Sequence, residues 1–454
     1  MIEQFQSLAT AFAQYAWGPW LLVLLLGGGA FFLIYTRFVP FRHIPHAFAI
    51  LRGKYDSPDD PGDLTHFQAL SSALAGTIGM GNIAGVALAI AIGGPGAIFW
   101  MWMTAVLGVA TKFFTCTLAV MYRGRDSAGT LRGGPMYVIR EGLPRRWHWL
   151  AYFFAVFGLI GTLPVLQANQ LIQVVRDVVF IDNGWLAGDG DHFTFNLTAG
   201  IVLTATAGTV IIGGLQRVAQ VASRIVPSMS VLYIGTTLLA IVLNVDRLPG
   251  VIGMILEDAF TARSAGAGAL LTMILYGVQR GAFSNEAGIG TESMAHGAAR
   301  TREPVREGLV AMLGPIIDTL FICSATAFAI LLSGEWRGDQ DGVTLTASAF
   351  QQLLGTPGLI VVVLTAVLFA VTTILTYSYY GTQCAGFLFG AQHRHHYQWL
   401  YIGFIIVASV VTLEAAISII DGAYALMAIP TMTSALLLAP RVREAARRYF
   451  SSID

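Results

Sequence analysis

Long apolar segments separated by short polar stretches run along the whole chain of 454 residues. A helix that crosses a bilayer needs about 20 mostly apolar residues. Residues 64–111 include no Asp, Glu, Lys or Arg, and only a Gly-Gly-Pro-Gly turn at 93–96 separates two segments there. The more polar stretch 342–356 favours a short amphipathic helix at the membrane interface. We expect eleven membrane-spanning helices, at residues 18–36, 66–92, 97–121, 150–175, 195–214, 226–245, 267–297, 308–332, 357–388, 398–419 and 422–438.

The composition also indicates a membrane protein. Hydrophobic residues make up 55% of the chain, charged residues only 11%, and the mean hydropathy is +0.67. A soluble protein usually carries about 25% charged residues, so a soluble enzyme and a disordered chain are excluded. The 26 basic and 26 acidic residues cancel, which gives no indication of nucleic-acid binding. Glycine reaches 50 residues, or about 11% against a usual ~7%, which is more than simple anchors require.

The basic residues alternate from loop to loop in a way that predicts the orientation. Twenty of the 26 Lys and Arg residues fall on one side of the expected membrane and four on the other. The remaining two, Lys112 and Arg280, lie inside segments. Because cytoplasmic loops carry the excess of Lys and Arg, we expect the N-terminus outside and the C-terminus in the cytoplasm, in a multi-pass protein of the cytoplasmic (inner) membrane.

Two of the expected helices contain an interruption. Residues 75–85 hold four glycines and Asn82, in the middle of segment 66–92. In lipid a broken helix is tolerated only where it lines a protein-enclosed cavity, and its freed N–H and C=O groups can bind an anion and a cation. Close helix packing through Gly81-xxx-Gly85 is the alternative. Residues 276–292 predict a second interruption, unless that helix simply ends near Val278.

The positions of the two interruptions predict an internal repeat. With the first segment set aside, the interrupted helices are the first and the sixth of ten, so each opens a block of five. An odd number of helices per block makes the blocks opposite in orientation, as in many secondary transporters. We therefore expect an all-α fold with an extra N-terminal helix and cytoplasmic loop at 1–62, repeats at 63–248 and 249–440, and a basic cytoplasmic tail at 441–454.

Three stretches, at 76–85, 133–137 and 279–288, resemble the sodium:alanine/glycine symporters, the alanine or glycine:cation symporter family. The resemblance extends over nearly the whole chain and includes residues 314–319 and 377–381. It implies the leucine-transporter-like fold, with its five-plus-five inverted repeat. It also implies sodium-coupled symport of alanine or glycine into the cytoplasm by alternating access. A proton as the coupling ion, or a different neutral amino acid, stays open as the alternative.

The resemblance implies a substrate site between the two interrupted helices. Backbone N–H groups near Met80 would receive the substrate carboxylate, and Phe283 would close over a small side chain. Tyr377 stands where the family more often has a tryptophan. The implied substrate-binding residues are Thr77, Gly79, Met80, Gly81, Asn82, Gln167, Phe283, Ser284, Asn285 and Tyr377.

A sodium site is implied between segments 66–92 and 357–388. The carbonyls of Ala75 and Ile78 and the hydroxyls of Thr372 and Thr373 would supply its oxygen ligands. The alternative is that both hydroxyls bond back to the preceding helical turn. Other polar groups inside segments, namely Lys112, Glu286 and Asp318, suggest an ion or proton path, with structural pairing as the favoured alternative.

Two other classes of membrane protein predict different patterns. A channel requires a continuous polar face or charged rings along a pore, and no segment has one. A membrane-embedded enzyme requires a cluster of histidine and carboxylate groups. The nine histidines lie mostly in loops, and we expect them to form no such paired constellation. We therefore expect a transporter with no catalytic residues and with sodium as coupling ion rather than prosthetic group.

Overall fold

A computed structural model describes residues 2–188, 190–261, 267–338, 340, 342–410 and 414–453, and most of them lie in helices. The elements, in chain order, are α1 (Ile2–Ala16), α2 (Pro19–Leu22), η1 (Val23–Gly27), α3 (Gly28–Tyr35), α4 (Val39–Arg42), α5 (Ile44–Leu51), α6 (His66–Thr77), η2 (Gly81–Gly85), α7 (Val86–Gly93), α8 (Ala97–Met121), β1 (Gly124–Arg125), β2 (Leu131–Arg132), α9 (Pro135–Gly142), η3 (Arg145–Trp147), α10 (Trp149–Gly161), α11 (Val165–Val174), η4 (Val175–Ile181), α12 (Phe193–Ile211), α13 (Gly214–Leu243), α14 (Leu248–Thr261), α15 (Ala267–Asn285), α16 (Glu292–His296), α17 (Pro304–Ala311), α18 (Leu313–Pro315), η5 (Ile316–Cys323), α19 (Ser324–Ser333), η6 (Glu335–Arg337), α20 (Gly342–Phe389), η7 (Ala391–His393), α21 (Arg394–Val410), α22 (Glu414–Leu426), α23 (Ala428–Leu437) and α24 (Ala439–Ser451).

The helices have the length and hydropathy of membrane spans. Eight in the described part of the chain are long and apolar enough to cross a bilayer, and the bent pair formed by α6 and residues 81–93 is a ninth candidate. The number eleven stays a prediction, because a break divides segment 267–297 and segment 398–419 includes residues 411–413, which lie outside the described part.

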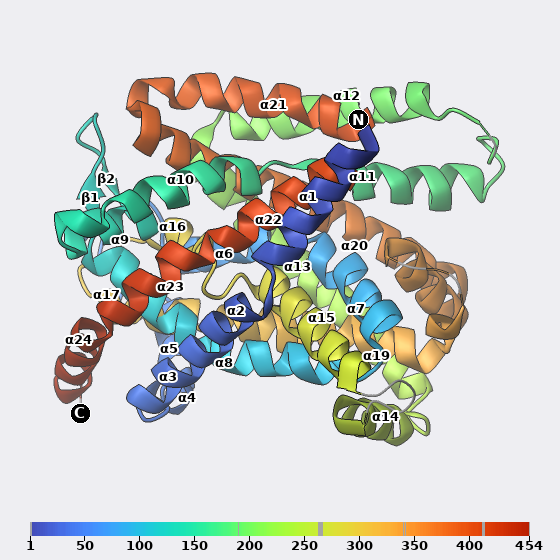
Figure 1. Cartoon of the computed structure of the whole chain (residues 1–454), viewed down its shortest axis with the longest axis horizontal. Coiled ribbons are helices and arrows are strands. Elements are labelled where there is room, and N and C mark those ends of the chain that lie inside the picture. Colours follow the sequence, from blue (N-terminus) through green and yellow to red (C-terminus); the bar gives the residue numbers. More distant parts are fainter. Residues whose placement is uncertain are drawn as a thin grey trace.

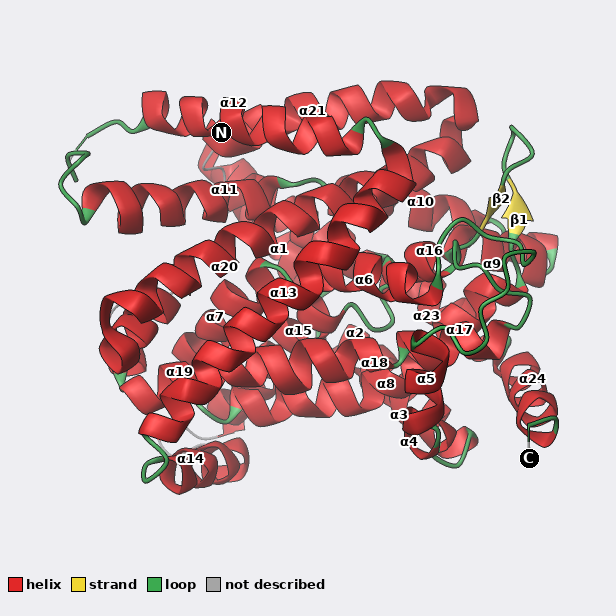
Figure 2. Ribbon diagram, turned by 180° about the vertical axis from the view of Figure 1, so that it is seen from behind, coloured by secondary structure: helices red, strands yellow, loops and turns green. Residues whose placement is uncertain are grey.

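The two ends of the molecule are formed by different structural elements. The β1–β2 hairpin, α9 and α24 lie at one end, and α14 and the connection between α11 and α12 lie at the other (Figure 1). Seen from behind, α12 and α21 again run side by side along one edge (Figure 2). The elements at the first end belong to a loop and a tail that together carry ten of the 26 basic residues.

Several helices occupy stretches for which the sequence predicted none, among them α1, α14 and α24. Helix α1 packs along α22, and α14 forms within a predicted loop. The predicted basic tail is helical as far as Ser451. Its buried residues Val442, Ala445, Ala446 and Tyr449 recur every three or four positions, which is the spacing of one helix face. The tail is therefore a docked amphipathic helix.

The first interruption predicted from the sequence is confirmed. Helix α6 starts with a capping box, in which the Thr65 hydroxyl accepts from the Gln68 N–H (3.2 Å) and the Gln68 side chain accepts from the Thr65 N–H (3.1 Å). It ends at Thr77, and the chain turns by 54° before it continues through η2 and α7. Two carbonyls beyond the bend, of Asn82 and Ile83, accept hydrogen bonds from threonine hydroxyls at 2.7 and 3.3 Å. Protein groups thus satisfy a backbone that lipid could not.

The second interruption is also confirmed. Helix α15 continues past Val278 and ends at Asn285, whose side-chain oxygen accepts from the Ala287 N–H at 3.0 Å. The alternative that this helix ends near Val278 is therefore wrong. Glu286 follows with φ 57°, a left-handed conformation that is uncommon for a residue with a side chain. A loop then leads to α16.

Some of the glycine excess serves helix packing instead of the interruptions. A Cβ atom on Gly277 of α15 would lie 2.5 Å from the carbonyl oxygen of Ala97 in α8. Only a residue without a side chain allows this approach. The glycine enrichment therefore has two physical causes, backbone bending and close helix contact.

Helix α20 joins two predicted segments. The stretch 342–356 is helical as expected, and a kink at Gly355 (φ 68°) separates it from the longer part that carries Thr372, Thr373 and Tyr377. Its buried side chains include Val343 and Phe350, so this short helix packs against the protein on one face. Its position relative to a membrane interface stays a prediction.

An ion-pair cluster at the basic end connects the two predicted repeats. Asp126, in the turn that connects β1 and β2, pairs with Arg132 (3.2 Å) and with Arg394 at the start of α21 (2.8 Å). Burial alone would raise the pKa of the Asp126 carboxyl, but the hydrogen bond from the Thr130 backbone and the charge of Arg394 lower the pKa below its ordinary value. The aspartate therefore stays ionised and keeps both arginines in place.

Candidate functional site

A buried carboxylate lies beside the bend that follows α6. Asp318 in η5 has no exposed surface. One of its oxygens accepts from the Asn82 amide (2.6 Å), and the other accepts from the hydroxyls of Ser284 (2.8 Å) and Thr319 (2.7 Å). The Asn82 side-chain oxygen accepts in turn from the Gly79 N–H at 2.8 Å. Groups from the α6 bend, α15 and η5 thus meet at one charge, which we call the Asp318 cluster.

The charge balance around this cluster favours cations. The Lys112 ammonium interacts electrostatically with Asp318, Glu286 and Glu292, and all four side chains are buried. A buried carboxylate is costly unless a cation or a proton compensates it. One ammonium cannot compensate three carboxylates. The oxygens of Asp318 and its neighbours are also the ligand type that hard cations prefer.

Glu286 connects the second interruption with α20. One of its carboxylate oxygens accepts from the Tyr377 hydroxyl at 2.9 Å, and the other accepts from the Thr291 hydroxyl at 2.5 Å. The Tyr377 hydroxyl also lies 3.4 Å from that of Tyr424 in α22. The loop between α15 and α16 is therefore held to two neighbouring helices by its one buried acid.

A cavity of about 130 Å³ adjoins these groups. It is small for a ligand pocket, since drug-sized ligands occupy roughly 300–1,000 Å³. Within the described residues, Gln167 Oε1, Arg280 Nε and Asp421 Oδ1 are buried without a hydrogen-bond partner. The cavity therefore presents one positive, one negative and one neutral polar group. Its lining consists of Leu88, Gly161, Leu163, Leu166, Gln167, Arg280, Phe283, Tyr377, Ile417, Ile420, Asp421 and Tyr424.

The structure divides the ten implied substrate residues into groups. Three line the cavity, namely Gln167, Phe283 and Tyr377. Three others, Gly79, Asn82 and Ser284, belong to the Asp318 cluster.

Gly81 lies between the two groups, because a Cβ atom there would be 3.4 Å from the Phe283 ring. Thr77, Met80 and Asn285 are buried but belong to neither group. The Thr77 hydroxyl lies 3.4 Å from the Leu74 carbonyl, and the Asn285 amide lies 3.4 Å from the Thr104 hydroxyl.

Of the two threonines implied as sodium ligands, only Thr373 faces the bend after α6. Both threonine hydroxyls bond back to their own helix, Thr372 to the Leu368 carbonyl (2.9 Å) and Thr373 to the Phe369 carbonyl (3.0 Å). Thr373 nevertheless faces the bend, since a Cβ atom on Gly79 would collide with its hydroxyl. Thr372 instead approaches the sulfur of Met229 in α13, at 4.0 Å.

A further threonine, one turn after Thr373, was missed by the sequence analysis. The Thr376 hydroxyl is buried and has no hydrogen-bond partner among the described residues. Its methyl group would lie 3.3 Å from a Cβ atom on Gly76, so the side chain faces α6 as Thr373 does. The implied ligands Ala75 and Ile78 are buried at the end of the same helix. The i, i+3 spacing of Thr373 and Thr376 places both on one face of a helix, and this spacing could have identified Thr376 from the sequence.

Two histidines and one glutamate form a link that contradicts a sequence expectation. Glu307 in α17 is fully buried and bonds to His66 Nδ1 and, at 2.5 Å, to His296 Nδ1. His66 is the first residue of α6, and His296 is the last of α16. The expectation that the histidines form no paired constellation is wrong, because 241 residues separate His66 from its partner in the chain. The link ties the two interrupted helices together.

Replacing Glu307 by alanine tests whether this link stabilises the fold. Removing one partner of a buried charged pair typically costs about 3–5 kcal/mol, which for a chain of this length lowers Tm by about 3–5 °C. Thermal unfolding in detergent, followed by intrinsic fluorescence, measures the shift. Glu444→Ala, at an exposed position in α24, is the matched control and should melt like the wild type. Equal Tm values for both variants would contradict the assignment.

Comparison with known proteins identifies relatives along the full chain. Residues 2–454 match the family described as the sodium:alanine symporter family. An uncharacterized transporter of Haemophilus influenzae is 39% identical, with 99% of this chain and 97% of the relative covered. The sodium/alanine symporter AgcS of Methanococcus maripaludis is 38% identical, with 96% of this chain and 95% of the relative covered.

A solved structure has a similar fold. MhsT in complex with L-phenylalanine superimposes with a TM-score of 0.54, over 84% of this chain and 98% of that chain, at 13% identity. Likeness at this identity concerns the fold alone. It confirms the leucine-transporter-like, all-α fold that the family resemblance implied.

Proposed function

The chain belongs to the sodium:alanine symporter family, and we propose that it couples sodium entry to the import of alanine or glycine by alternating access. Members of this family with this fold are secondary amino-acid transporters and not enzymes. The chain is a multi-pass membrane protein of that kind. The amino acid, the coupling ion and the site residues are the parts that we propose here.

The single observation that carries the proposal is the contact of both candidate sites with the bend after α6. The Asp318 cluster includes Gly79 and Asn82 from this bend. Phe283, which lines the cavity, packs next to Gly81. A ligand can shift a conformational equilibrium only through its different affinity for the two states. A cation and an amino acid that contact the same bend can therefore favour the same movement, which is the requirement for coupling.

The cavity suits a small zwitterion. Arg280 is placed to receive a carboxylate and Asp421 an ammonium group, and each has an unpartnered atom among the described residues. Gln167 adds a neutral acceptor. Phe283 and Tyr424, whose ring centroids are 5.3 Å apart, leave little room for a long side chain. This supports alanine or glycine over larger neutral amino acids.

We assign sodium to oxygen ligands on two sides of the bend. Asp318, Asn82 and Ser284 would hold one ion, and Thr373 with the carbonyls of Ala75 and Ile78 would hold another. The excess of buried carboxylates also fits protonation, so proton coupling is the second candidate. A different neutral amino acid is the second candidate for the substrate.

The proposed orientation places the N-terminus outside and the C-terminus in the cytoplasm. The gathering of β1–β2, α9 and α24 at one end of the molecule supports it (Figure 1), since these elements adjoin the basic loops and cytoplasmic loops carry the excess of Lys and Arg. We propose five-helix repeats at 63–248 and 249–440. The first opens with the interrupted helix α6, and in the second the short helix α14 precedes the interrupted helix α15.

Uptake into proteoliposomes tests the function. Purified protein should accumulate labelled alanine against its gradient when sodium is outside. Replacement of sodium by choline should reduce uptake to that of empty liposomes. Uptake that continues in choline and follows an imposed proton gradient would contradict sodium coupling. Uptake of glutamine or leucine, with none of alanine or glycine, would contradict the substrate assignment.

Thr373→Ala tests the second cation site. The loss of one oxygen ligand to a charged group, worth about 1.5–3 kcal/mol, should raise the sodium concentration for half-maximal uptake about tenfold or more. Thr365→Ala is the matched control, because Thr365 is also buried in α20 and bonds back to its own helix at 2.7 Å. It should keep the sodium dependence of the wild type. Equal sodium dependence in both variants would contradict the site.

A further inference from the structure

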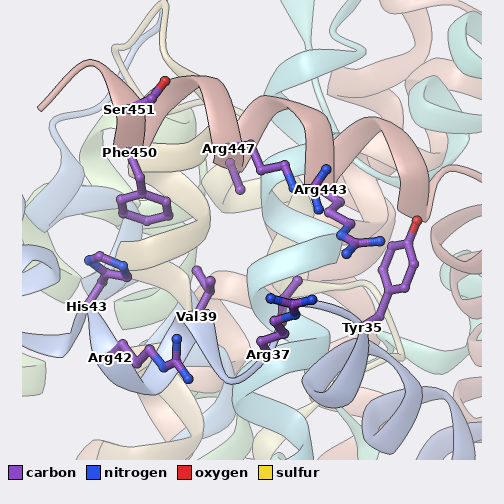
Figure 3. A pocket seen from close by; sticks show the side chains of 11 residues that line it. Tyr35, Arg37, Val39, Arg42, His43, Arg443, Arg447, Phe450 and Ser451 are labelled. Atoms are coloured by element: carbon purple, nitrogen blue, oxygen red, sulfur yellow. The ribbon is translucent and has the colours of Figure 1, made fainter. Parts of the chain in front are cut away.

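A second cavity, larger than the first, lies between residues 35–43 and the C-terminal helix α24. It has a volume of about 350 Å³, and the helices that form it are α3, α4 and α24 (Figure 3). Small-molecule sites usually occupy roughly 300–1,000 Å³, so it is large enough for a ligand. Its lining is Tyr35, Thr36, Arg37, Val39, Arg42, His43, Arg443, Ala446, Arg447, Phe450 and Ser451.

The charge of this cavity is strongly one-sided. Four arginines line it, Arg37 and Arg42 from the N-terminal side and Arg443 and Arg447 from α24. The lining includes no carboxylate, and among the described residues none of the four arginines forms an ion pair with one. Guanidinium groups match the geometry of phosphate oxygens. Four of them on one cavity therefore indicate a phosphate-bearing ligand.

The cavity walls are fixed by local structure. Arg37 and Phe38 both have positive φ, 55° and 61°, a combination that costs energy for residues with side chains. This turn ends α3 and starts α4. Across the cavity, the Arg443 guanidinium lies 4.5 Å from the centre of the Tyr35 ring, and His43 stacks on Phe450 at 3.8 Å. Both aromatic contacts join the N-terminal segment to α24 (Figure 3).

The cavity lies at the depth where membrane spans end. Tyr35 is the last residue of the span candidate 4–35, and Leu437 is the last of the candidate 416–437, just before α24. Ile34 and Leu437 are 68% and 47% exposed, so an exposed apolar side chain lies at the end of each of these two spans. Phosphate groups of lipids occupy this interfacial level, and basic pockets beside transmembrane helices bind them.

We propose that this cavity is a binding site for the phosphate headgroup of an anionic glycerophospholipid. The arginines would hold the phosphate, and the acyl chains would follow the exposed apolar residues of α3 and α23. A bound lipid would join the N-terminal segment to α24. The apolar path favours a lipid over free inorganic phosphate, which carries no group to cover Ile34 and Leu437.

Native mass spectrometry of the purified protein tests the proposal. The probes are phosphatidylglycerol and phosphatidylcholine, added in equal amounts to the delipidated protein in detergent. The wild type should retain phosphatidylglycerol preferentially. Arg443→Gln combined with Arg447→Gln should weaken that retention about tenfold or more, given roughly one kcal/mol for each basic residue near an anionic lipid. Arg145→Gln combined with Arg146→Gln removes two basic residues that do not line the cavity and should leave retention unchanged.

Inorganic phosphate separates the two sources of the anion. At millimolar concentration it should displace little phosphatidylglycerol from the wild type and should not change its Tm. Displacement of the lipid by phosphate, or equal retention of phosphatidylglycerol by the two double variants, would overturn the proposal. Thermal unfolding of each variant confirms that it is folded. If the double variant at Arg443 and Arg447 does not fold, the single variant Arg447→Gln takes its place, because the Arg447 side chain is exposed.

Discussion

The burial of the Asp318 charge beside a bent helix is the constraint on which the rest of the structure depends. A carboxylate inside a membrane protein must have donors and a compensating positive charge. Asn82, Ser284 and Thr319 supply donors at 2.6–2.8 Å. Asn82 can do so because the chain bends after Thr77, which turns its side chain toward both the Gly79 N–H and the acid. The bend after Thr77 therefore positions the donor that the Asp318 carboxylate needs, and the carboxylate in turn holds the Asn82 side chain at the bend.

The same interior has polar links at two levels. Near the middle, Glu286 holds the second interruption to Tyr377. At the basic end, Glu307 holds His66 and His296, which belong to the two interrupted helices. Glu307 is fully buried, so breaking its bonds to the two histidines costs free energy. A movement of α6 and α16 relative to α17 would have to open the Glu307 link. Alternating access would then depend on how tightly this link competes with the ligands.

The sequence was sufficient for the interruptions and the fold class but not for the contacts. Glycine clusters at 75–85 and the polar run 276–292 predict backbone breaks, because lipid does not tolerate them without a cavity. Helices α1, α14 and α24 were missed, since their polar or short sequences do not resemble membrane spans. The Glu307 link and the Asp318 cluster join residues more than 200 positions apart. Local periodicity has no information about such pairs.

The roles of Gln167 and Tyr377 came from family resemblance, and the structure adds that both line one cavity.

Sodium-dependent thermal stability of Asp318→Asn tests the central claim most directly. Melting curves of the wild type and the variant are recorded at increasing sodium, with potassium or choline keeping the ionic strength constant. A ligand that binds only the folded state raises Tm in a saturable way. The wild type should show this rise with sodium alone, and Asp318→Asn should lose all or most of it. Asp246→Asn, at an exposed position, should behave as the wild type. An unchanged sodium-dependent rise in Asp318→Asn would contradict a cation site at this carboxylate.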